Sequence, residues 1–568
     1  MSIDLRSGSR FFIIATTLVV GTISLLSIGP IIWLFTGSLL DAPPGKPAQL
    51  TPSNYISILF SAEFSQVLFN TLIYVFGSTL LSVSIATLMA ILVVLTDIPH
   101  KRLLEILIIL PYVLPMSLLS LGYIFLFSPR IGFVNAFLTE TFNMTSPLFN
   151  IYSLAGMTWL TGVFEIPIAF IIIASSLRMM DYSYIESAKI CGASILKLYL
   201  NTLLPIMRPT ILAVIFLNIV RSLEIFDIPA FVGIPANVWV MPTYVYKIAT
   251  QGYFTDIGRA SAAGVLFMSV AVLFVLLYRH YTKKAYRFIT IGQRGFRPGI
   301  QSLGKWKYPA LIALLSFLII TFFIPVFIVV LVSFMPVLRV PSIESFSKLT
   351  IENYVKLWSY PAVERAFINT FFISFFGATV GIVLLFTAAY IIARWRSKIS
   401  VFLESIIFMP FSVPGIVIAL GFVWYYINLP IGLYGTIWAL ILAYITRFMP
   451  LGYRPISSNL VQLDPELEGA ARVCGASLPR TLLSITSRLV RNGLFAGWFL
   501  LAILFMRELG VSILLSKTGS EVLAVIFYDL YGFGFWSQLS ALGTIMLTAS
   551  IILYVVSSRL SRGINIVE

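Results

Sequence analysis

The sequence predicts an all-α membrane protein with about 12 transmembrane helices, arranged as two pseudo-symmetric six-helix halves with both termini in the cytoplasm. Three observations lead to this prediction: the apolar composition, a series of long apolar segments and an internal repeat. Of the 568 residues, 59% are hydrophobic and 11% are charged, and the mean hydropathy is +0.97. Soluble domains have about 45–50% apolar and roughly 25% charged residues. Because a soluble fold could not cover this much apolar surface, lipid must surround most of the chain.

The same composition excludes several classes of protein. It is incompatible with a cytosolic enzyme, a disordered chain and a disulfide-stapled scaffold. The 2 cysteines, Cys191 and Cys474, do not lie in a CxxC pair, and the only histidines are His100 and His280. These residues are too few to hold a transition-metal centre, so no fixed metal site is expected. The net charge of +15 would indicate nucleic acid in a soluble protein. In a membrane protein the position of the cations matters more, and no nucleic-acid partner is expected.

Twelve apolar segments come close to the length of about 20 residues that a helix needs to cross the hydrocarbon. They lie near residues 11–37, 67–95, 103–127, 150–177, 210–234, 258–280, 308–335, 367–393, 402–427, 433–453, 493–516 and 537–558. The first segment is longer than the core of a secretory signal, which has about 7–15 residues. We therefore expect it to be a retained span.

The distribution of lysine and arginine predicts the orientation. With the N-terminus inside, most of the 38 cationic residues fall in cytoplasmic segments, for example Lys101, Lys189 and the cluster between residues 279 and 307. Short cytoplasmic loops of membrane proteins carry an excess of Lys and Arg. We therefore expect both termini in the cytoplasm, together with the polar segments 184–205 and 465–488.

An internal repeat organises the chain. The Asn-Thr pair at residues 70–71 recurs at 369–370, an offset of 299, and the proline-containing segment 110–115 recurs at 409–414 with the same offset. The sequence Cys-Gly-Ala-Ser at residues 191–194 recurs later, at an offset of 283. The offset changes because the loop around residues 128–150 is longer in the first half.

The repeat predicts three parts: a first half at residues 1–280, a basic cytoplasmic linker at 281–307 and a second half at 308–568. Because corresponding spans run in the same direction, the halves are related by an axis along the membrane normal, and a pore or gate between them follows. The recurring prolines free backbone carbonyls, which survive in lipid only when they are buried or face a watery cavity. Their matched positions favour a packed central region.

Two polar, helix-forming segments end in glycine at equivalent places, after the fourth span of each half. One copy could be an interfacial helix on the lipid surface. Two copies in a two-fold chain favour a symmetric cytoplasmic partner. The residues that carry the pattern are Glu186, Ser187, Ala188, Gly192, Leu204 and Pro205 in the first half, and Glu468, Gly469, Ala470, Ala471 and Gly475 in the second.

These segments resemble the EAA loop of ABC-importer permeases, which has Glu-Ala-Ala, three residues, Gly, nine residues, Ile, one residue and Leu-Pro. Thr202 replaces the Ile in the first half. In the second half Gly469 stands at the Glu position, with Glu468 one residue earlier, and Ser487-Arg488 replaces Leu-Pro. The resemblance implies a type I ABC importer permease-like fold in a prokaryotic cytoplasmic (inner) membrane.

The resemblance also implies the partners. In the family these loops dock on a dimer of ABC ATPase subunits at the cytoplasmic face, and a periplasmic or extracellular solute-binding protein delivers the solute. ATP and Mg then belong to the partner subunits, and no cofactor and no enzymatic activity are expected in this chain.

Residues 222–230 and 507–515, in a fused chain, are similar to the ferric-iron permeases, a group related to the thiamine, polyamine and phosphonate permeases. Ferric iron is therefore the first expectation for the solute, with thiamine, polyamine, phosphonate or phosphorylated solutes as alternatives. A secondary transporter driven by an ion gradient is the rival class, because it also has two six-span halves.

One segment imitates a nucleotide site. Residues 299–305 have the GxxxxGK spacing of a phosphate loop, but Trp306 stands where Ser or Thr should bind magnesium, and no strand is predicted before it. We expect a flexible basic linker here, so that separate subunits hydrolyse ATP.

Ionisable residues inside predicted spans are costly and therefore functional candidates. They are Arg221, Glu224, Asp227, Arg507 and Glu508. Two interpretations remain open: structural salt bridges between spans, or residues that line the translocation path or its gate. Carboxylate oxygens suit a hard cation such as ferric iron, whereas arginine suits an anionic solute. Glu165, in the fourth span, is a weaker candidate.

Overall fold

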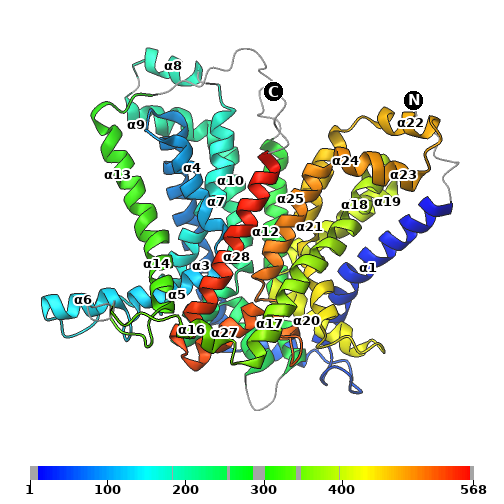
Figure 1. The fold of residues 1–568 in the computed structure, drawn as a ribbon, viewed down its shortest axis with the longest axis horizontal. Coiled ribbons are helices and arrows are strands. Elements are labelled where there is room, and N and C mark those ends of the chain that lie inside the picture. Colours follow the sequence, from blue (N-terminus) through cyan, green and yellow to red (C-terminus); the bar gives the residue numbers. More distant parts are fainter. Residues whose placement is uncertain are drawn as a thin grey trace.

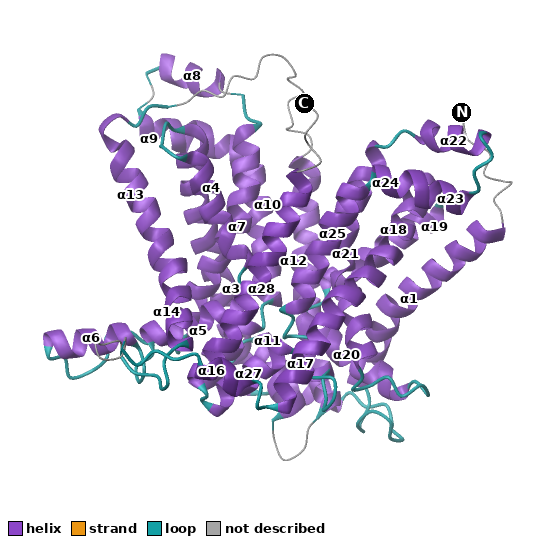
Figure 2. Cartoon of the chain, in the orientation of Figure 1, coloured by secondary structure: helices purple, strands orange, loops and turns teal. Residues whose placement is uncertain are grey.

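The computed structural model describes residues 10–181, 183–192, 194–251, 256–285, 301–340, 347–395 and 397–562. In these ranges every regular element is helical, and the strand-like features are two isolated bridges, Leu40 with Leu50 and Thr96 with Gln301 (Figure 2).

The long helices of the predicted halves, residues 1–280 and 308–568, follow one another along the chain (Figure 1). The first half contains α1 (Arg10–Ser38), α3 (Ala62–Ala90), α4 (Lys101–Ile109), α5 (Met116–Phe127), α7 (Leu154–Arg178), α10 (Leu204–Glu224) and α12 (Ile257–Ala285). The second half contains α13 (Lys307–Leu318), α14 (Ile324–Ser333), α17 (Pro361–Phe372), α18 (Ala378–Arg394), α19 (Lys398–Phe408), α20 (Gly415–Asn428), α21 (Ile437–Gln462), α25 (Arg491–Met506) and α28 (Trp536–Arg562).

Eight helical segments of the described chain are long and apolar enough to cross a membrane, and three bent pairs raise the number to 11. The bent pairs are Lys101–Val113 with Met116–Phe127, Lys398–Ser412 with Gly415–Asn428, and Leu478–Leu489 with Arg491–Met506, with bends of 98°, 111° and 79°. The chain is thus an all-α, multi-pass membrane protein, as predicted. The first two breaks coincide with the recurring prolines.

One predicted span is not among these 11. The predicted span 433–453 overlaps α21, which begins at Ile437, has 26 residues and is therefore about 39 Å long. This helix carries Arg447 and Arg454 and two internal prolines. Its length is sufficient for a span, but its apolar character is weaker than that of the others.

The fifth spans end earlier than predicted. The sequence analysis extended them to residues 234 and 516, but α10 ends at Glu224 and α25 ends at Met506. After α25, the backbone N–H of Val511 donates to the Glu508 carboxylate at 2.8 Å. Such a local side-chain acceptor competes with the helical hydrogen-bond pattern. Arg221 and Glu224 therefore lie in the last turn of α10, whereas Asp227, Arg507 and Glu508 lie beyond the ends of α10 and α25.

The two halves interlock through their first spans. α1 of the first half packs on α20, and α14 of the second half packs on α5. Both contacts depend on a glycine: a Cβ at Gly122 would lie 2.4 Å from the carbonyl oxygen of Pro325, and a Cβ at Gly421 would lie 2.4 Å from that of Pro30. Each repeat therefore places its first span against the opposite repeat.

This close approach gives a direct test. Gly421→Ala is expected to destabilise the protein, because its methyl group would collide with the backbone of α1; overpacking typically costs about 1–3 kcal/mol. Thermal unfolding of the purified protein in detergent measures the effect. Gly21→Ala, in α1, is the matched control because a Cβ there meets nothing within 4 Å. Equal stability of the two variants would contradict the interlocking contact.

Two short helices lie apart from each other at one end of the molecule. They are α8 (Ser183–Ile190) and α22 (Pro465–Val473), and the start of α1 and the end of α28 lie toward this same end (Figure 1). The opposite end carries α6 (Phe133–Phe142), α16 (Glu352–Leu357) and α27 (Leu523–Phe533). The two ends of the described chain therefore share one side of the molecule.

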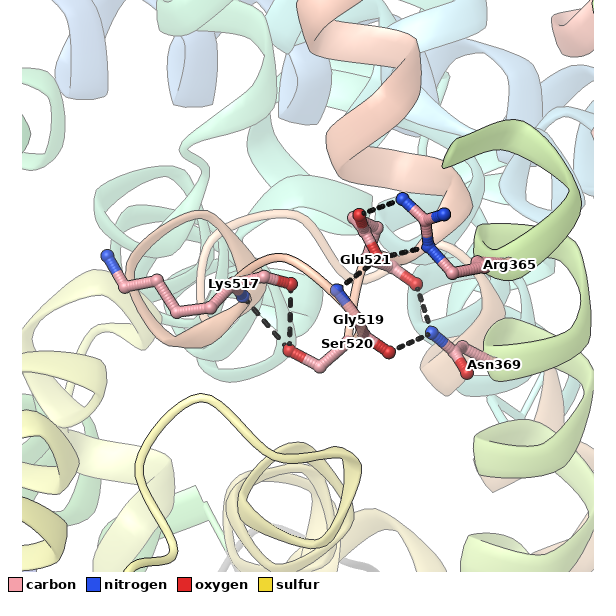
Figure 3. Close-up of polar contacts among 6 residues, drawn as sticks. All are labelled: Arg365, Asn369, Lys517, Gly519, Ser520 and Glu521. Atoms are coloured by element: carbon pink, nitrogen blue, oxygen red, sulfur yellow. Dashed lines mark hydrogen bonds and ion pairs between the residues drawn. The ribbon is translucent and has the colours of Figure 1, made fainter. Parts of the chain in front are cut away.

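The recurring Asn-Thr pair holds a loop near the second of these ends. In the second half, Asn369 donates to the carbonyls of Gly519 and Glu521 at 3.1 and 2.9 Å, and the Thr370 hydroxyl accepts from the N–H of Leu523 at 2.9 Å. Arg365 adds an ion pair to Glu521 at 2.9 Å (Figure 3).

The first half repeats this clamp. Asn70 donates to the carbonyl of Trp239 at 3.2 Å, and Thr71 accepts from the N–H of Met241 at 2.9 Å. Met241 begins α11 (Met241–Thr250), as Leu523 begins α27. The Asn-Thr pair therefore fixes the start of α11 in the first half and of α27 in the second.

Candidate functional site

A cavity of about 110 Å³ lies between the two halves. On the same measure one water molecule needs about 10–15 Å³, so the cavity has room for several. Its wall contains all five charged residues that the sequence analysis selected, and it also contains Tyr112, Phe411 and Arg447. The charged residues from the sequence prediction are Arg221, Glu224, Asp227, Arg507 and Glu508.

Two of these charges form buried ion pairs. In the first half Arg221 at the end of α10 binds Glu165 of α7 through two hydrogen bonds, 2.7 and 3.0 Å long. The Glu165 side chain is 1% exposed. Glu165, the weaker sequence candidate, is thus the partner of Arg221.

The second half forms the equivalent pair with the charges exchanged. Arg447 of α21 contacts Glu508, which follows α25. The fourth span therefore contributes the acid in the first half and the base in the second. The guanidinium of Arg447 lies where a side chain on Gly415 would lie, so this glycine makes room for it. Sequence analysis missed Arg447, although an arginine inside a predicted span is itself a signal.

Arg507 links the two halves across the cavity. It donates to the carbonyls of Tyr112 and Leu114 at 2.9 and 3.1 Å, and its guanidinium lies 5.5 Å from the centre of the Tyr112 ring. These carbonyls belong to the proline break between α4 and α5. The break thus exposes acceptors that an arginine of the opposite half satisfies.

The remaining carboxylates, Glu224 and Asp227, face the cavity without an ion pair within 4 Å in the described part of the chain. Equivalent positions at an offset of 284 are Glu508, which is paired, and Val511. The phenol of Tyr112 corresponds to Phe411 at an offset of 299. Oxygen atoms that could meet a cation therefore come chiefly from the first half.

The cavity offers charge rather than a coordination shell. Among the described residues, no group of three or more His, Cys, Asp or Glu side chains is placed to hold a metal ion together. A cation in this cavity would meet individual oxygen ligands, which allows it to leave again. This property suits a path more than a storage site.

An aromatic cluster closes the interface near α27. Phe231 of the first half packs against Phe527, Tyr528 and Tyr531 of α27, with ring centres 5.7, 5.5 and 4.7 Å apart. The Tyr531 hydroxyl donates to the carbonyl of Phe231 at 2.7 Å. This cluster therefore joins the first half, through Phe231, to α27 of the second half.

The two EAA-like segments form short helices, α8 and α22, as the sequence predicts. Each is followed by a glycine with positive φ, Gly192 at +77° and Gly475 at +84°, a conformation that glycine adopts at no steric cost. The exposed apolar residues also match: Tyr184 and Ile190 on α8 correspond to Leu467 and Val473 on α22. Leu204 and Pro205 form the first turn of α10.

The glutamate side chains of the two segments point to different surroundings. Glu186 on α8 is exposed, whereas Glu468 on α22 is buried and 6% exposed. Glu468 pairs with Arg394 of α18. At the motif position Gly469 carries no side chain that could replace the outward-facing acid. The two segments therefore present similar apolar faces but different charges.

Comparison with known proteins agrees with this architecture. Residues 386–565 match the family model described as the binding-protein-dependent transport system inner membrane component. The ferric transport system permease protein FbpB of Actinobacillus pleuropneumoniae is 24% identical over 501 residues, which cover 87% of this chain and 70% of that protein.

One further relative and one solved structure match parts of this chain. The Fe(3+)-transport system permease protein FbpB 2 of Haemophilus influenzae is 22% identical over 485 residues, which cover 84% of this chain and 86% of that protein. A bacterial alginate ABC transporter in complex with its alginate-bound periplasmic protein has a chain that matches 50% of this one with a TM-score of 0.42 and 19% identity. Residues 386–565 of this multi-pass membrane protein are thus similar to the inner membrane components of binding-protein-dependent transport systems.

Proposed function

We propose that this chain is the fused transmembrane permease of an ABC importer and that its solute is ferric iron. The observation that carries the proposal is the cavity between the halves, where Glu224 and Asp227 line the wall without an ion pair in the described part of the chain. Oxygen ligands such as carboxylates suit hard cations. Two relatives named as ferric-iron permeases align with more than four fifths of this chain.

The partners follow from the two ends of the molecule. An ATPase dimer docks on α8 and α22, where the matched apolar residues Tyr184 and Leu467 are exposed. It holds ATP and Mg on its own subunits, and this chain has no cofactor and no ATPase activity. A solute-binding protein delivers iron at the end that carries α6 and α27.

The orientation follows from charge. The segments that hold α8 and α22 lie in the cation-rich part of the loop pattern, which faces the cytoplasm. The protein therefore lies in a prokaryotic inner membrane with both termini inside. The predicted basic linker shares this excess of cations, and its residues 286–300 lie outside the described part of the chain.

The transport cycle uses the two halves as opposing bodies. When the ATPases close, α8 and α22 move together and the halves rock about the central cavity. Opening of the aromatic cluster around Phe231 exposes the cavity to the binding protein. Its closure, together with separation of α8 and α22, exposes the cavity to the cytoplasm.

Reconstitution tests this function. Proteoliposomes that contain the chain, its co-purified ATPase and a ferric-iron-loaded binding protein are expected to accumulate radioactive iron only when ATP is present. Uptake of radioactive thiamine, spermidine or phosphonate in place of iron would overturn the solute assignment. Uptake that follows an ion gradient without any ATPase would show a secondary transporter and overturn the importer.

A further inference from the structure

The carboxylate of Glu468 is held inside the molecule by four hydrogen bonds. Arg394 donates to both carboxylate oxygens at 3.1 Å, Tyr390 donates at 3.3 Å and Thr486 donates at 3.1 Å. Arg394 also donates to the carbonyl of Leu463 at 3.1 Å, just before α22. The Arg394 and Glu468 side chains are only 12% and 8% exposed. The Glu468 carboxylate is thus fully engaged by its own chain.

These partners connect α22 to two membrane helices. Tyr390 and Arg394 belong to the last turn of α18, and Thr486 ends the helical turn Leu482–Thr486 that leads to α25. A hydrogen-bonded ion pair is directional, and breaking a buried pair leaves an uncompensated charge. α22 is therefore fixed in orientation relative to both helices.

The first half has a different attachment at the equivalent positions. Offsets of 283 and 299 relate Glu468, Thr486, Tyr390 and Arg394 to Ile185, Leu203, Ile91 and Leu95, which are all apolar. Ile185 is 2% exposed, Leu203 is 1% exposed and Leu95 is 6% exposed. Apolar contacts are non-directional, so they permit sliding and rotation that an ion pair resists. Among the side chains that the structure describes, α8 is attached by apolar burial and makes no ion pair.

We infer that Arg394 and Glu468 are positioning residues that lock α22 to the spans, so that the two coupling helices transmit ATPase movement through unlike attachments. This inference rests on the proposed importer function. It gives Glu468 a role inside the chain rather than in contact with the ATPase. The ATPase then meets α22 through apolar residues such as Leu467 and Val473, and only α8 offers it the motif acid, Glu186.

Replacement of the four polar residues around α22 by their first-half counterparts tests the inference. The variant Tyr390→Ile, Arg394→Leu, Glu468→Ile and Thr486→Leu gives the second half the residues of the first. Because it removes both charges together, we expect it to fold and to assemble with the ATPase. The number of iron ions imported per ATP hydrolysed is expected to fall about fivefold or more. A merely structural pair would lower the yield of complex and leave this ratio unchanged.

Hydrogen exchange of the α22 backbone provides a readout that needs no transport. In the wild-type complex α22 is expected to be protected more strongly than α8, and the quadruple variant is expected to abolish this difference. Ile185→Leu, a volume-conserving change in the first half, is the matched control and is expected to leave both measurements unchanged. Arg394→Lys, which keeps the charge, is expected to restore part of the coupling ratio relative to Arg394→Leu.

Two results would overturn the inference. One is a quadruple variant with the wild-type ratio of iron to ATP, and the other is equal protection of α8 and α22 in the wild-type complex. Failure of the proposed function looks different, because the wild-type complex itself would then show no ATP-dependent iron uptake. In that case the hydrogen-exchange measurement still decides whether Arg394 and Glu468 hold α22 on the spans.

Discussion

The variant with both Glu224→Gln and Asp227→Asn is expected to lose iron uptake, by about 10²-fold or more. Each carboxylate offers a charged oxygen to the cation, and interactions with charged groups contribute about 1.5–3 kcal/mol each. Tenfold corresponds to about 1.4 kcal/mol, so two lost interactions reach this size. Both amides keep the shape of the side chains. Initial rates of radioactive iron uptake in proteoliposomes measure the effect.

The control for this variant is Glu404→Gln on α19, an exposed glutamate that does not line the cavity. Loss of this exposed charge is expected to leave uptake unchanged. ATP hydrolysis by the assembled complex provides a second control, since loss of a solute contact leaves assembly intact. Wild-type uptake by the double amide would remove Glu224 and Asp227 from the path.

Arg507→Met is expected to shift the conformational equilibrium of the protein by about tenfold or more. The arginine makes two hydrogen bonds across the cavity to the carbonyls of Tyr112 and Leu114. Loss of bonds that involve a charged group weakens this conformation by about 1.5–3 kcal/mol per bond, and states in which the contact is already broken lose nothing. The population with separated α8 and α22 should therefore decrease.

The chain contains attachment sites for spin labels, which allow the distance between α8 and α22 to be measured. Cys191 and Cys474 are its 2 cysteines, and both are exposed at equivalent places after α8 and α22. Distances between spin labels on these two residues report how far apart the helices lie. We expect a larger fraction of short distances in Arg507→Met than in the wild type without nucleotide. An unchanged distribution would show that the Arg507 contact does not hold the halves in this arrangement.

Much of this architecture could be predicted from the sequence, because lipid makes strict demands. Long apolar segments and the repeat indicated the helices, and the cost of intramembrane charge selected Arg221 and Glu508 before any geometry was known. The same argument applied to Arg447 would have completed the second ion pair. Pairing itself could not be predicted, since the hydropathy pattern does not say which residues on neighbouring spans meet.

Two features needed the structure for physical reasons. The packing of α1 on the opposite half depends on close backbone approach at Gly421, which hydropathy does not report. The direction of Glu468 depends on Arg394, 74 residues earlier in the chain. A motif predicts a helix with an acid at one position, but a shift of one residue turns the side chain to another face. Sequence spacing alone therefore could not separate a partner contact from an internal bond.

The interlocked first spans determine the order in which helix contacts can form during translation. α1 is complete at Ser38, but its neighbour α20 begins only at Gly415. At about 5–20 residues per second, the ribosome needs roughly 20–75 s to make the chain between them. During that interval α1 contacts lipid or an insertion factor in place of α20. In contrast, α5 has already been synthesised when α14 is made, so these two helices can pack at once. A gene split within the linker would therefore yield two polypeptides, each of which lacks the packing partner of its first span until the two associate.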